Sequence, residues 1–264
     1  MTTITTSAPA VAPFAASTAL SSYSNPAASH VAPRDAQLLG RLTGLFFLLT
    51  YATSIPPVAV LYVPALSDPV FVLGGPFDAG VSWGVVLELL LILANIATAL
   101  TLYPVLKRRF PVLSLAFVAA RIMESAFIAV GIVAVMALVS LRMDAAGADE
   151  GTLLVVGQAL VAIHDWTFKM GPGIVVGVGN GIILGVMMWK TRLVPRSLSA
   201  LGLVGGPALL ASSTAVLLGY TEFGSLVQSL AVAPEFFWEL FLGIWLLARG
   251  FNPEALAALD AQQS

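Results

Sequence analysis

Long apolar stretches with few charged residues constrain the fold of this chain more than any other feature. A helix needs about 20 apolar residues to cross the hydrocarbon core of a bilayer. The chain is 58% hydrophobic and 10% charged, whereas charged residues make up about a quarter of an ordinary soluble domain. Because backbone groups in lipid must bond to one another, the sequence predicts an all-α polytopic membrane protein. The stretches cover about residues 38–63, 82–106, 112–141, 152–170, 172–190, 198–218 and 226–248.

The distribution of charge indicates how many times the chain crosses the membrane. Basic residues are expected in the cytoplasmic loops, and the acidic residues occupy the alternate loops. From the acidic loop at 142–150, a single crossing brings the chain back to the basic side at Lys190. The sequence therefore predicts six transmembrane helices with both termini in the cytoplasm. Nine of the twelve Lys and Arg residues define the basic side: Arg34, Arg41, Lys107, Arg108, Arg109, Lys190, Arg192, Arg196 and Arg249.

The stretch at 152–170 then has two conformations open to it. It could form an interfacial or half-inserted helix before a crossing over 172–189, or one long helix could continue through both and bend at Pro172. This stretch is amphipathic, because Gln158, Asp165 and Lys169 fall on one helical stripe. We predict six spans plus one interfacial or half-inserted helix, with seven full spans as the alternative.

Composition divides the chain into three regions. Residues 1–36 include an Ala, Ser, Thr and Pro-rich segment that predicts a disordered cytoplasmic tail, because such residues bury too little apolar surface to offset chain entropy. Residues 37–251 are expected to form the helical transmembrane domain, and residues 252–264 a short cytoplasmic tail.

Several ionisable residues fall in the interior of the predicted spans, where an unpaired charge costs several kcal/mol, and four of them are selected on this ground. They are Glu88, Arg121, Glu124 and Glu239. We predict that they line a polar pocket in the outer half of the membrane, which His164 and Asp165 approach from the outer side. His164, Asp165 and Glu239 are the catalytic candidates, because an imidazole can act as either acid or base near neutral pH.

The other predicted ligand-binding residues are Glu88, Arg121, Glu124, Trp166, Asn180 and Trp238. A structural role is the alternative for most of them. Arg121 with Glu124 and Glu239 could form a buried ion-pair lattice that fixes helix packing. Asp165 and Lys169, four residues apart, could form a simple surface ion pair.

Small residues at four-residue spacing, Gly177, Gly181 and Gly185, are typical of a face on which two membrane helices pack closely.

Sequence signals for a cofactor are weak. The chain has no cysteine, and His164 is the single histidine in a predicted span, so neither bis-histidine haem nor a cysteine-ligated metal is expected. The net charge of −2 gives no reason to expect nucleic acid as a partner.

Six ordered segments carry a family resemblance. They are GRLTGLFFLLTYATSIP at 40–56, LYPVLKRR at 102–109, VAARIMES at 118–125, ALVAIHDWTFKMGPG at 159–173, RLVPRSLSALGLVGGP at 192–207 and WELFLGIWLLARGF at 238–251. Over about residues 37–251 the chain resembles a bacterial polytopic membrane family catalogued as domain of unknown function 4386. The resemblance implies a multi-helix protein of the inner membrane and implies no activity. The family pattern features Arg121, Glu124, His164, Trp166, residues 171–173 and Glu239.

Three functions agree with these features. The first is the binding, with or without chemical alteration, of a small lipophilic or amphiphilic molecule in the outer-half pocket. The second is a proton-linked carrier in which Glu124 or Glu239 takes up a proton, although the chain shows no internal duplication of the kind that carriers often have. The third is a non-catalytic scaffold subunit. The lipid bilayer is the expected partner, and the sequence does not indicate an oligomeric state.

Overall fold

The computed structural model of the chain describes residues 32–261, so most of the predicted N-terminal tail lies outside the described residues. All regular elements in this range are helical. They are α1 (Pro33–Pro56), η1 (Pro57–Leu61), α2 (Val63–Ser67), η2 (Phe71–Leu73), α3 (Ala79–Leu106), α4 (Pro111–Met143), α5 (Glu150–Phe168), η3 (Lys169–Val175), η4 (Gly177–Leu184), α6 (Gly185–Thr191), α7 (Arg196–Leu217), α8 (Leu226–Arg249) and α9 (Pro253–Ala261).

Six helices in the described residues are long and apolar enough to cross a membrane. The prediction of an all-α, multi-pass membrane protein with six spans is therefore confirmed. The spans are Pro33–Leu61, Ala79–Leu106, Pro111–Met143, Glu150–Thr191, Arg196–Leu217 and Leu226–Arg249.

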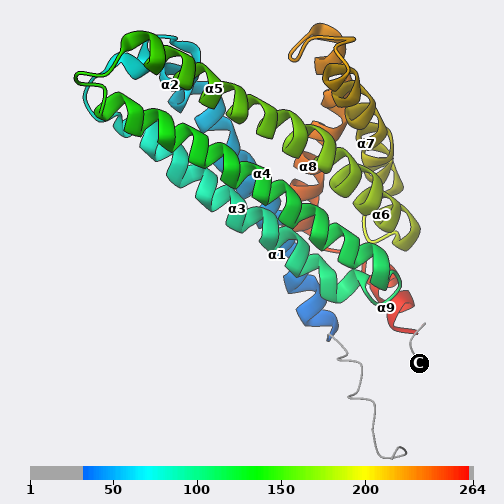
Figure 1. Cartoon of the computed structure of the whole chain (residues 1–264). Coiled ribbons are helices and arrows are strands. Elements are labelled where there is room, and N and C mark those ends of the chain that lie inside the picture. Colours follow the sequence, from blue (N-terminus) through cyan, green and yellow to red (C-terminus); the bar gives the residue numbers. More distant parts are fainter. Residues whose placement is uncertain (1–31, 262–264) are drawn as a thin grey trace, which may run out of the picture.

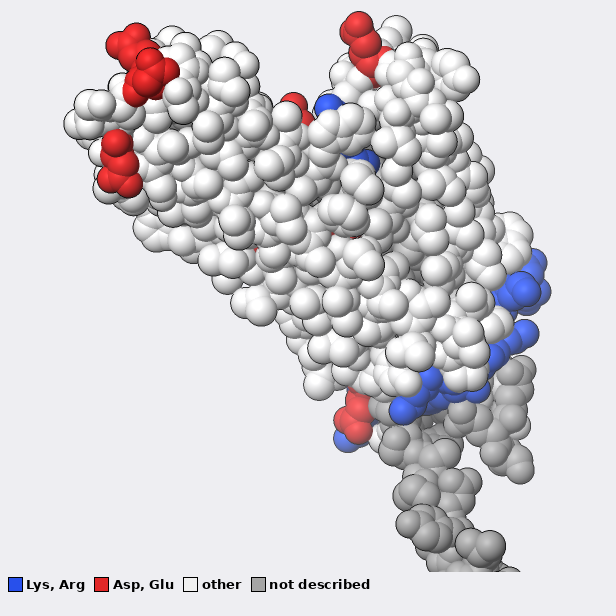
Figure 2. All heavy atoms as spheres, viewed as in Figure 1, with Lys and Arg blue, Asp and Glu red and all other residues white. Residues whose placement is uncertain are grey.

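The spans form two arms that diverge toward one end of the molecule (Figure 1). One arm contains α3, α4 and α5, and the other contains α7 and α8. Two connections join the arms. In the first, α1 packs against both α3 and α8. In the second, η4 and α6 continue the helical span that begins with α5, and they pack against α7. The space-filling view shows a notch between the tips of the arms (Figure 2).

Charge is distributed unequally between the two ends of the bundle. Figure 2 shows acidic residues at the tips of both arms and most basic residues at the opposite end. We refer to these as the acidic end and the basic end. The loops of the acidic end contain Asp68, Asp78, Asp144, Asp149 and Glu222. Two of these carboxylates cap helices. Asp78 accepts a hydrogen bond from the Val81 amide at the start of α3. Asp149 accepts hydrogen bonds from the backbone and side chain of Thr152, and these bonds hold the pKa of Asp149 below its usual range.

The fourth span distinguishes between the two conformations that the sequence left open. Residues 150–191 form one continuous helical span of 42 residues, not an interfacial helix followed by a separate crossing. The span stays continuous because the chain adopts π geometry around Pro172, where the Val176 amide bonds to the Gly171 carbonyl five residues earlier. A π turn re-satisfies backbone groups that a proline would otherwise leave unpaired. At about 1.5 Å per residue the span is about 63 Å long, and it crosses obliquely from one arm to the other (Figure 1).

Replacing Pro172 with alanine tests this continuity. In a continuous helix, Pro172→Ala should leave the thermal stability in detergent unchanged or slightly raised, because alanine restores a backbone donor and favours helix. The matched control is Leu184→Ala in the same span, where the leucine is fully buried. That variant should lose about 2–5 kcal/mol of stability. A larger loss for Pro172→Ala than for Leu184→Ala would indicate a direction change at the proline instead.

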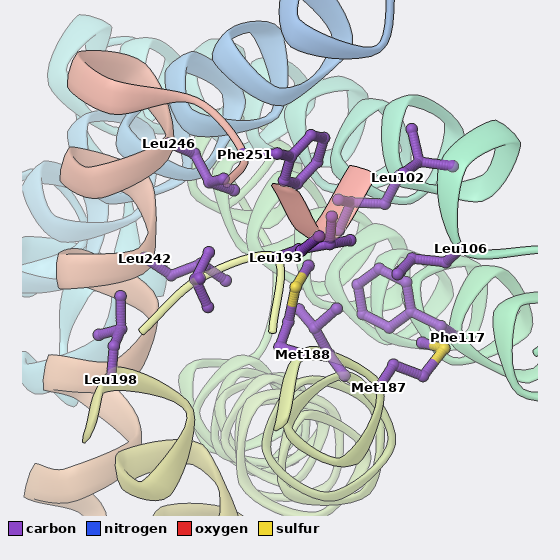
Figure 3. Packing of buried hydrophobic residues seen from close by; sticks show 14 of the residues in the cluster. Leu102, Leu106, Phe117, Met187, Met188, Leu193, Leu198, Leu242, Leu246 and Phe251 are labelled. Carbon is purple, nitrogen blue, oxygen red and sulfur yellow. The ribbon is translucent and has the colours of Figure 1, made fainter. Parts of the chain in front are cut away.

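The core at the basic end draws side chains from most of the spans. Figure 3 shows Leu102 and Leu106 of α3, Phe117 of α4, Met187 and Met188 of α6, and Leu242 and Leu246 of α8 converging around Leu193 and Phe251. The chain after α8 also contributes. Residues 253–261, predicted as part of a tail, form α9, and its Leu256 and Leu259 are buried in this core.

The close-packing face predicted from Gly177, Gly181 and Gly185 is confirmed. These glycines contact the backbone of α7, where a Cβ at Gly177 would lie 2.9 Å from the Gly206 carbonyl oxygen. On α7, a Cβ at Gly206 would lie 2.6 Å from the Gly177 carbonyl oxygen. The two backbones therefore approach so closely that neither helix has room for a side chain at these positions.

Candidate functional site

Buried polar side chains of the transmembrane bundle form three clusters. We call them the Arg121 network (Asn95, Thr98, Arg121 and Glu124), the Glu235 cluster (Asn180, Glu235, Trp238 and Glu239) and the His164 cluster (Tyr62, Glu88 and His164). The clusters differ in how well their hydrogen-bonding groups are satisfied, and this difference distinguishes a structural role from a functional one.

The Arg121 network connects α3 to α4 and is closed. Arg121 is 2% exposed and donates from Nη1 to Glu124 Oε2 at 2.7 Å, from Nη2 to Asn95 Oδ1 at 2.8 Å and from Nε to Thr98 Oγ1 at 3.2 Å. Asn95 in turn donates from Nδ2 to Glu124 Oε1 at 3.1 Å. The predicted pairing of Arg121 with Glu124 is therefore confirmed. Because both charges are paired and further hydrogen-bonded, the network fits a structural role.

The Glu235 cluster lies where α8 crosses η4 and α7. Glu235, Trp238 and Glu239 are spaced so that one face of α8 presents all three. Trp238 donates from its indole nitrogen to the Asn180 backbone carbonyl at 3.0 Å, and Asn180 donates from Nδ2 to Glu239 Oε1. Asn180 lies in η4, which has π geometry, and π segments occur frequently at functional sites.

Three acceptor atoms of the Glu235 cluster have no donor. Both carboxyl oxygens of Glu235 and the side-chain oxygen of Asn180 are buried, and none has a hydrogen-bond partner among residues 32–261. Glycines make the space for the carboxyl group, because a Cβ at Gly181 would lie 2.6 Å from Glu235 Oε2 and one at Gly205 would lie 2.8 Å from it. The fold thus places an unpaired carboxyl group between two glycine-lined helix faces.

The Arg121 network and the Glu235 cluster influence each other through space. Arg121 and Glu124 both act electrostatically on Glu239, and Arg121 also acts on Glu235. No direct ion pair joins Arg121 to Glu239 in the described residues, since the guanidinium bonds to Glu124 instead. Counting Arg121, Glu124, Glu235 and Glu239, carboxyl groups outnumber the guanidinium by three to one, so the shared environment attracts cations or protons.

The His164 cluster lies nearer the acidic end. Tyr62 donates from its hydroxyl to Glu88 Oε2 at 2.8 Å, and its ring meets the His164 ring edge to face, with 5.8 Å between centroids. His164 Nδ1 is buried without a hydrogen-bond partner among the described residues. Its distance to Asp165 Oδ1 is 3.9 Å, which is too long for a hydrogen bond.

Asp165 and Trp166 are partly exposed and belong to none of the three clusters. The Asp165 side chain is 51% exposed and, with Gln158, lines a hollow of about 230 Å³ beside α2. The expected Asp165–Lys169 ion pair is not among the ion pairs of the described chain. The Lys169 ammonium lies instead over the rings of Trp166 and Phe223, at 5.0 Å and 5.5 Å from their centroids.

The predicted site residues therefore divide among several locations. Arg121 bonds to Glu124, Asn180 bonds to both Trp238 and Glu239, and Glu88 lies with His164 around Tyr62. Sequence reasoning did not select Glu235, although its position four residues before Glu239 on the same helical face was a usable signal. It also did not select Tyr62, whose partnership with Glu88 depends on how η1 and α3 pack.

Comparison with known proteins identifies the family. The family model described as domain of unknown function (DUF4386) matches residues 42–250. The chain belongs to this family. It matches no curated protein and no solved structure. Membership of the DUF4386 family agrees with a helical membrane bundle and adds no ligand or reaction.

Proposed function

We propose that this DUF4386 protein binds a small amphiphilic molecule inside the membrane and that the Glu235 cluster holds its polar group. The observation that carries the proposal is the set of three buried, unpaired acceptors: Glu235 Oε1 and Oε2 and Asn180 Oδ1. A buried polar atom without a partner costs about 1–3 kcal/mol. A ligand that donates hydrogen bonds to these atoms would recover that free energy on binding.

The charges favour a cationic amphiphile with N–H donors, such as a primary amine. Carboxylate and amide oxygens accept hydrogen bonds, and an ammonium group supplies three donors and a positive charge. Glu235 and Glu239 are one helical turn apart on one face of α8, so two ionised carboxylates at these positions would repel each other. A bound ammonium group would relieve this repulsion and satisfy the free oxygens together.

The surroundings of the cluster suit an apolar tail. Glu239 is only half-buried, whereas Glu235 is 2% exposed, so Glu239 lies nearer the outer surface of α8 than Glu235 does. Exposed aromatic rings adjoin it on α8: the rings of Phe236 and Phe237 are 5.5 Å apart, and those of Phe237 and Phe241 are 5.6 Å apart. These rings provide an apolar surface along which an alkyl chain could lie.

Three probes with the same alkyl chain test this function. Dodecylamine carries charge and N–H donors, dodecyltrimethylammonium carries charge without donors, and dodecanol carries one donor without charge. Only dodecylamine should raise the melting temperature of the protein in a mild detergent substantially. In Glu235→Gln its apparent affinity should fall by about tenfold or more, because a charge-assisted hydrogen bond is lost.

Glu222→Gln is the matched control, since it removes one exposed carboxylate at the acidic end. It should respond to dodecylamine like the unmodified protein. An equal response of Glu235→Gln and Glu222→Gln would contradict binding at the Glu235 cluster, and so would equal stabilisation by all three probes.

Catalysis by His164, Asp165 and Glu239 has less support than binding. No hydrogen bond, ion pair or ring contact joins His164 to Glu239 within residues 32–261. A ligand altered by both residues would have to reach from the His164 cluster to the Glu235 cluster. Binding as proposed above requires the Glu235 cluster alone.

A proton-linked carrier is the second candidate, and the same cluster supports it. Two carboxyl groups one helical turn apart, with no bonded cation, can share and exchange a proton. Proton flux into proteoliposomes that depends on an added amine, and is lost in Glu235→Gln, would favour the carrier over a simple binding protein. A scaffold role would leave all of these responses absent.

For orientation, we propose that both termini and the basic end face the cytoplasm of a bacterium whose inner membrane holds the protein. Single cysteines introduced in the chain without natural cysteines can test this. A cysteine at Asp149 should react with an impermeant maleimide in intact cells, whereas cysteines at Arg108 and Arg192 should react only after permeabilisation. The reverse pattern would invert the orientation.

A further inference from the structure

A hollow at the basic end of the bundle gathers three arginines. It has a volume of about 640 Å³ and lies where α6 ends, α7 begins and α8 meets α9. Arg192, Arg196 and Arg249 contribute to its wall, and no Asp or Glu does. All three arginines are exposed, and none forms an ion pair with a carboxylate within the described residues. The hollow is therefore a positively charged site whose lining residues include no carboxylate.

Two tryptophans orient two of the three arginines, Arg196 and Arg249. The Arg196 guanidinium lies over the Trp189 ring at 5.2 Å from its centroid, and the Arg249 guanidinium lies over the Trp245 ring at 5.7 Å. Such stacking orients a guanidinium while leaving its N–H groups free to donate. Tryptophan is also enriched where membrane spans meet the lipid headgroups, and both spans end within a few residues of these rings.

The backbone around the hollow is held in a specific conformation. Arg192 has a φ of 57°, and no other non-glycine residue in the described chain has a positive φ. The turn that follows is tied to the C-terminal segment, because the Asn252 amide donates to the Leu193 carbonyl at 2.9 Å. The helices α7 and α9 both begin at the hollow, next to Pro195 and Asn252. Asn252 already caps α9 through the Glu254 amide, whereas the start of α7 has no side-chain cap, and amide groups at such a helix start favour an anion.

We propose that this hollow binds the phosphate group of an anionic phospholipid. Guanidinium groups pair with phosphate oxygens through two hydrogen bonds at once. Three guanidinium groups line this hollow. The hollow has the size of a typical small-molecule site, enough for a glycerophosphate headgroup. Its position at the ends of three spans places it at headgroup level, where lipid phosphate is far more concentrated than free phosphate.

Binding of defined lipids to the full chain in detergent tests the proposal. Dioleoylphosphatidylglycerol should raise the melting temperature, and dioleoylphosphatidylcholine should raise it much less. Arg196→Gln with Arg249→Gln should weaken phosphatidylglycerol binding by about tenfold or more. The control pair is Lys107→Gln with Arg109→Gln, since these cations also stack on aromatic rings, Tyr103 and Phe110, at the same end. The control pair should bind like the unmodified protein.

Arg192→Gly separates binding from folding. Glycine adopts a positive φ without strain, so this variant should keep or gain stability and yet bind phosphatidylglycerol more weakly. Equal losses in the two double variants would overturn the proposal, because they would indicate general charge attraction. Inorganic phosphate that stabilises as well as the lipid at equal concentration would overturn the lipid assignment.

Discussion

Replacing Arg121 with methionine is expected to lower the free energy of unfolding by about 3–5 kcal/mol, the range observed when one partner of a buried ion pair is removed. The reason is that Glu124 would then remain buried beside Asn95 without its cation. Chemical or thermal unfolding in detergent measures the loss. A change of less than about 1 kcal/mol would show that the network is not structural.

Double variants identify the partner of Arg121. Combining Arg121→Met with Glu124→Met should recover much of the lost stability, because no lone charge remains buried. Combining Arg121→Met with Glu239→Gln should recover little, since Glu239 bonds to Asn180 and not to the guanidinium. The opposite ranking of the two double variants would make Glu239, not Glu124, the partner that matters for folding.

Gly206→Ala is expected to destabilise the bundle by about 3 kcal/mol, at the upper end of the usual cost of overpacking. The added Cβ would lie 2.6 Å from the Gly177 carbonyl oxygen and 2.7 Å from the Gly181 backbone. These neighbours are backbone atoms, so only a separation of the two helices could make room. The same separation would disturb the space around Glu235, and amine binding should weaken together with stability.

Gly151→Ala is the control for this prediction. The nearest atom to a Cβ at Gly151 is a carboxylate oxygen of Asp149 at 3.3 Å, on a side chain that can move. Alanine favours helix over glycine by about 0.5–1 kcal/mol, so this variant should be unchanged or slightly more stable. If both glycine variants behaved alike, close packing between η4 and α7 would not be a source of stability.

Much of the fold could be predicted from the sequence because it depends on local properties. The apolar stretches, together with the alternation of basic and acidic loops, predict the number of spans, and the i, i+3 spacing of Arg121 and Glu124 predicts their contact. The fourth span was only partly predictable, because hydropathy does not distinguish a helix that ends at Pro172 from one that continues in π geometry.

The candidate site was harder to predict because it depends on which helices meet. Nothing in the sequence indicates that Asn95 completes the bonds of Arg121, or that Asn180 bonds to Glu239 and leaves Glu235 without a donor. The cost of burying a charge identifies which side chains need a partner. It does not show which of them have a hydrogen-bond partner in the folded chain and which do not. The partners depend on how the helices pack. Because packing leaves the Glu235 carboxyl group without a donor, Glu235 replaces His164 as the leading candidate for the binding site.

The most direct test of the account is an experimental structure of the full chain determined with dodecylamine. The account predicts density for the amine nitrogen within hydrogen-bonding distance of the Glu235 carboxyl group and the Asn180 side-chain oxygen, with the alkyl chain extending past Glu239. The closed bonding of Arg121 to Glu124 and Asn95 should be unchanged. A Glu235 carboxyl group that bonds only to other groups of the protein, with no density beside it, would contradict the proposed binding site.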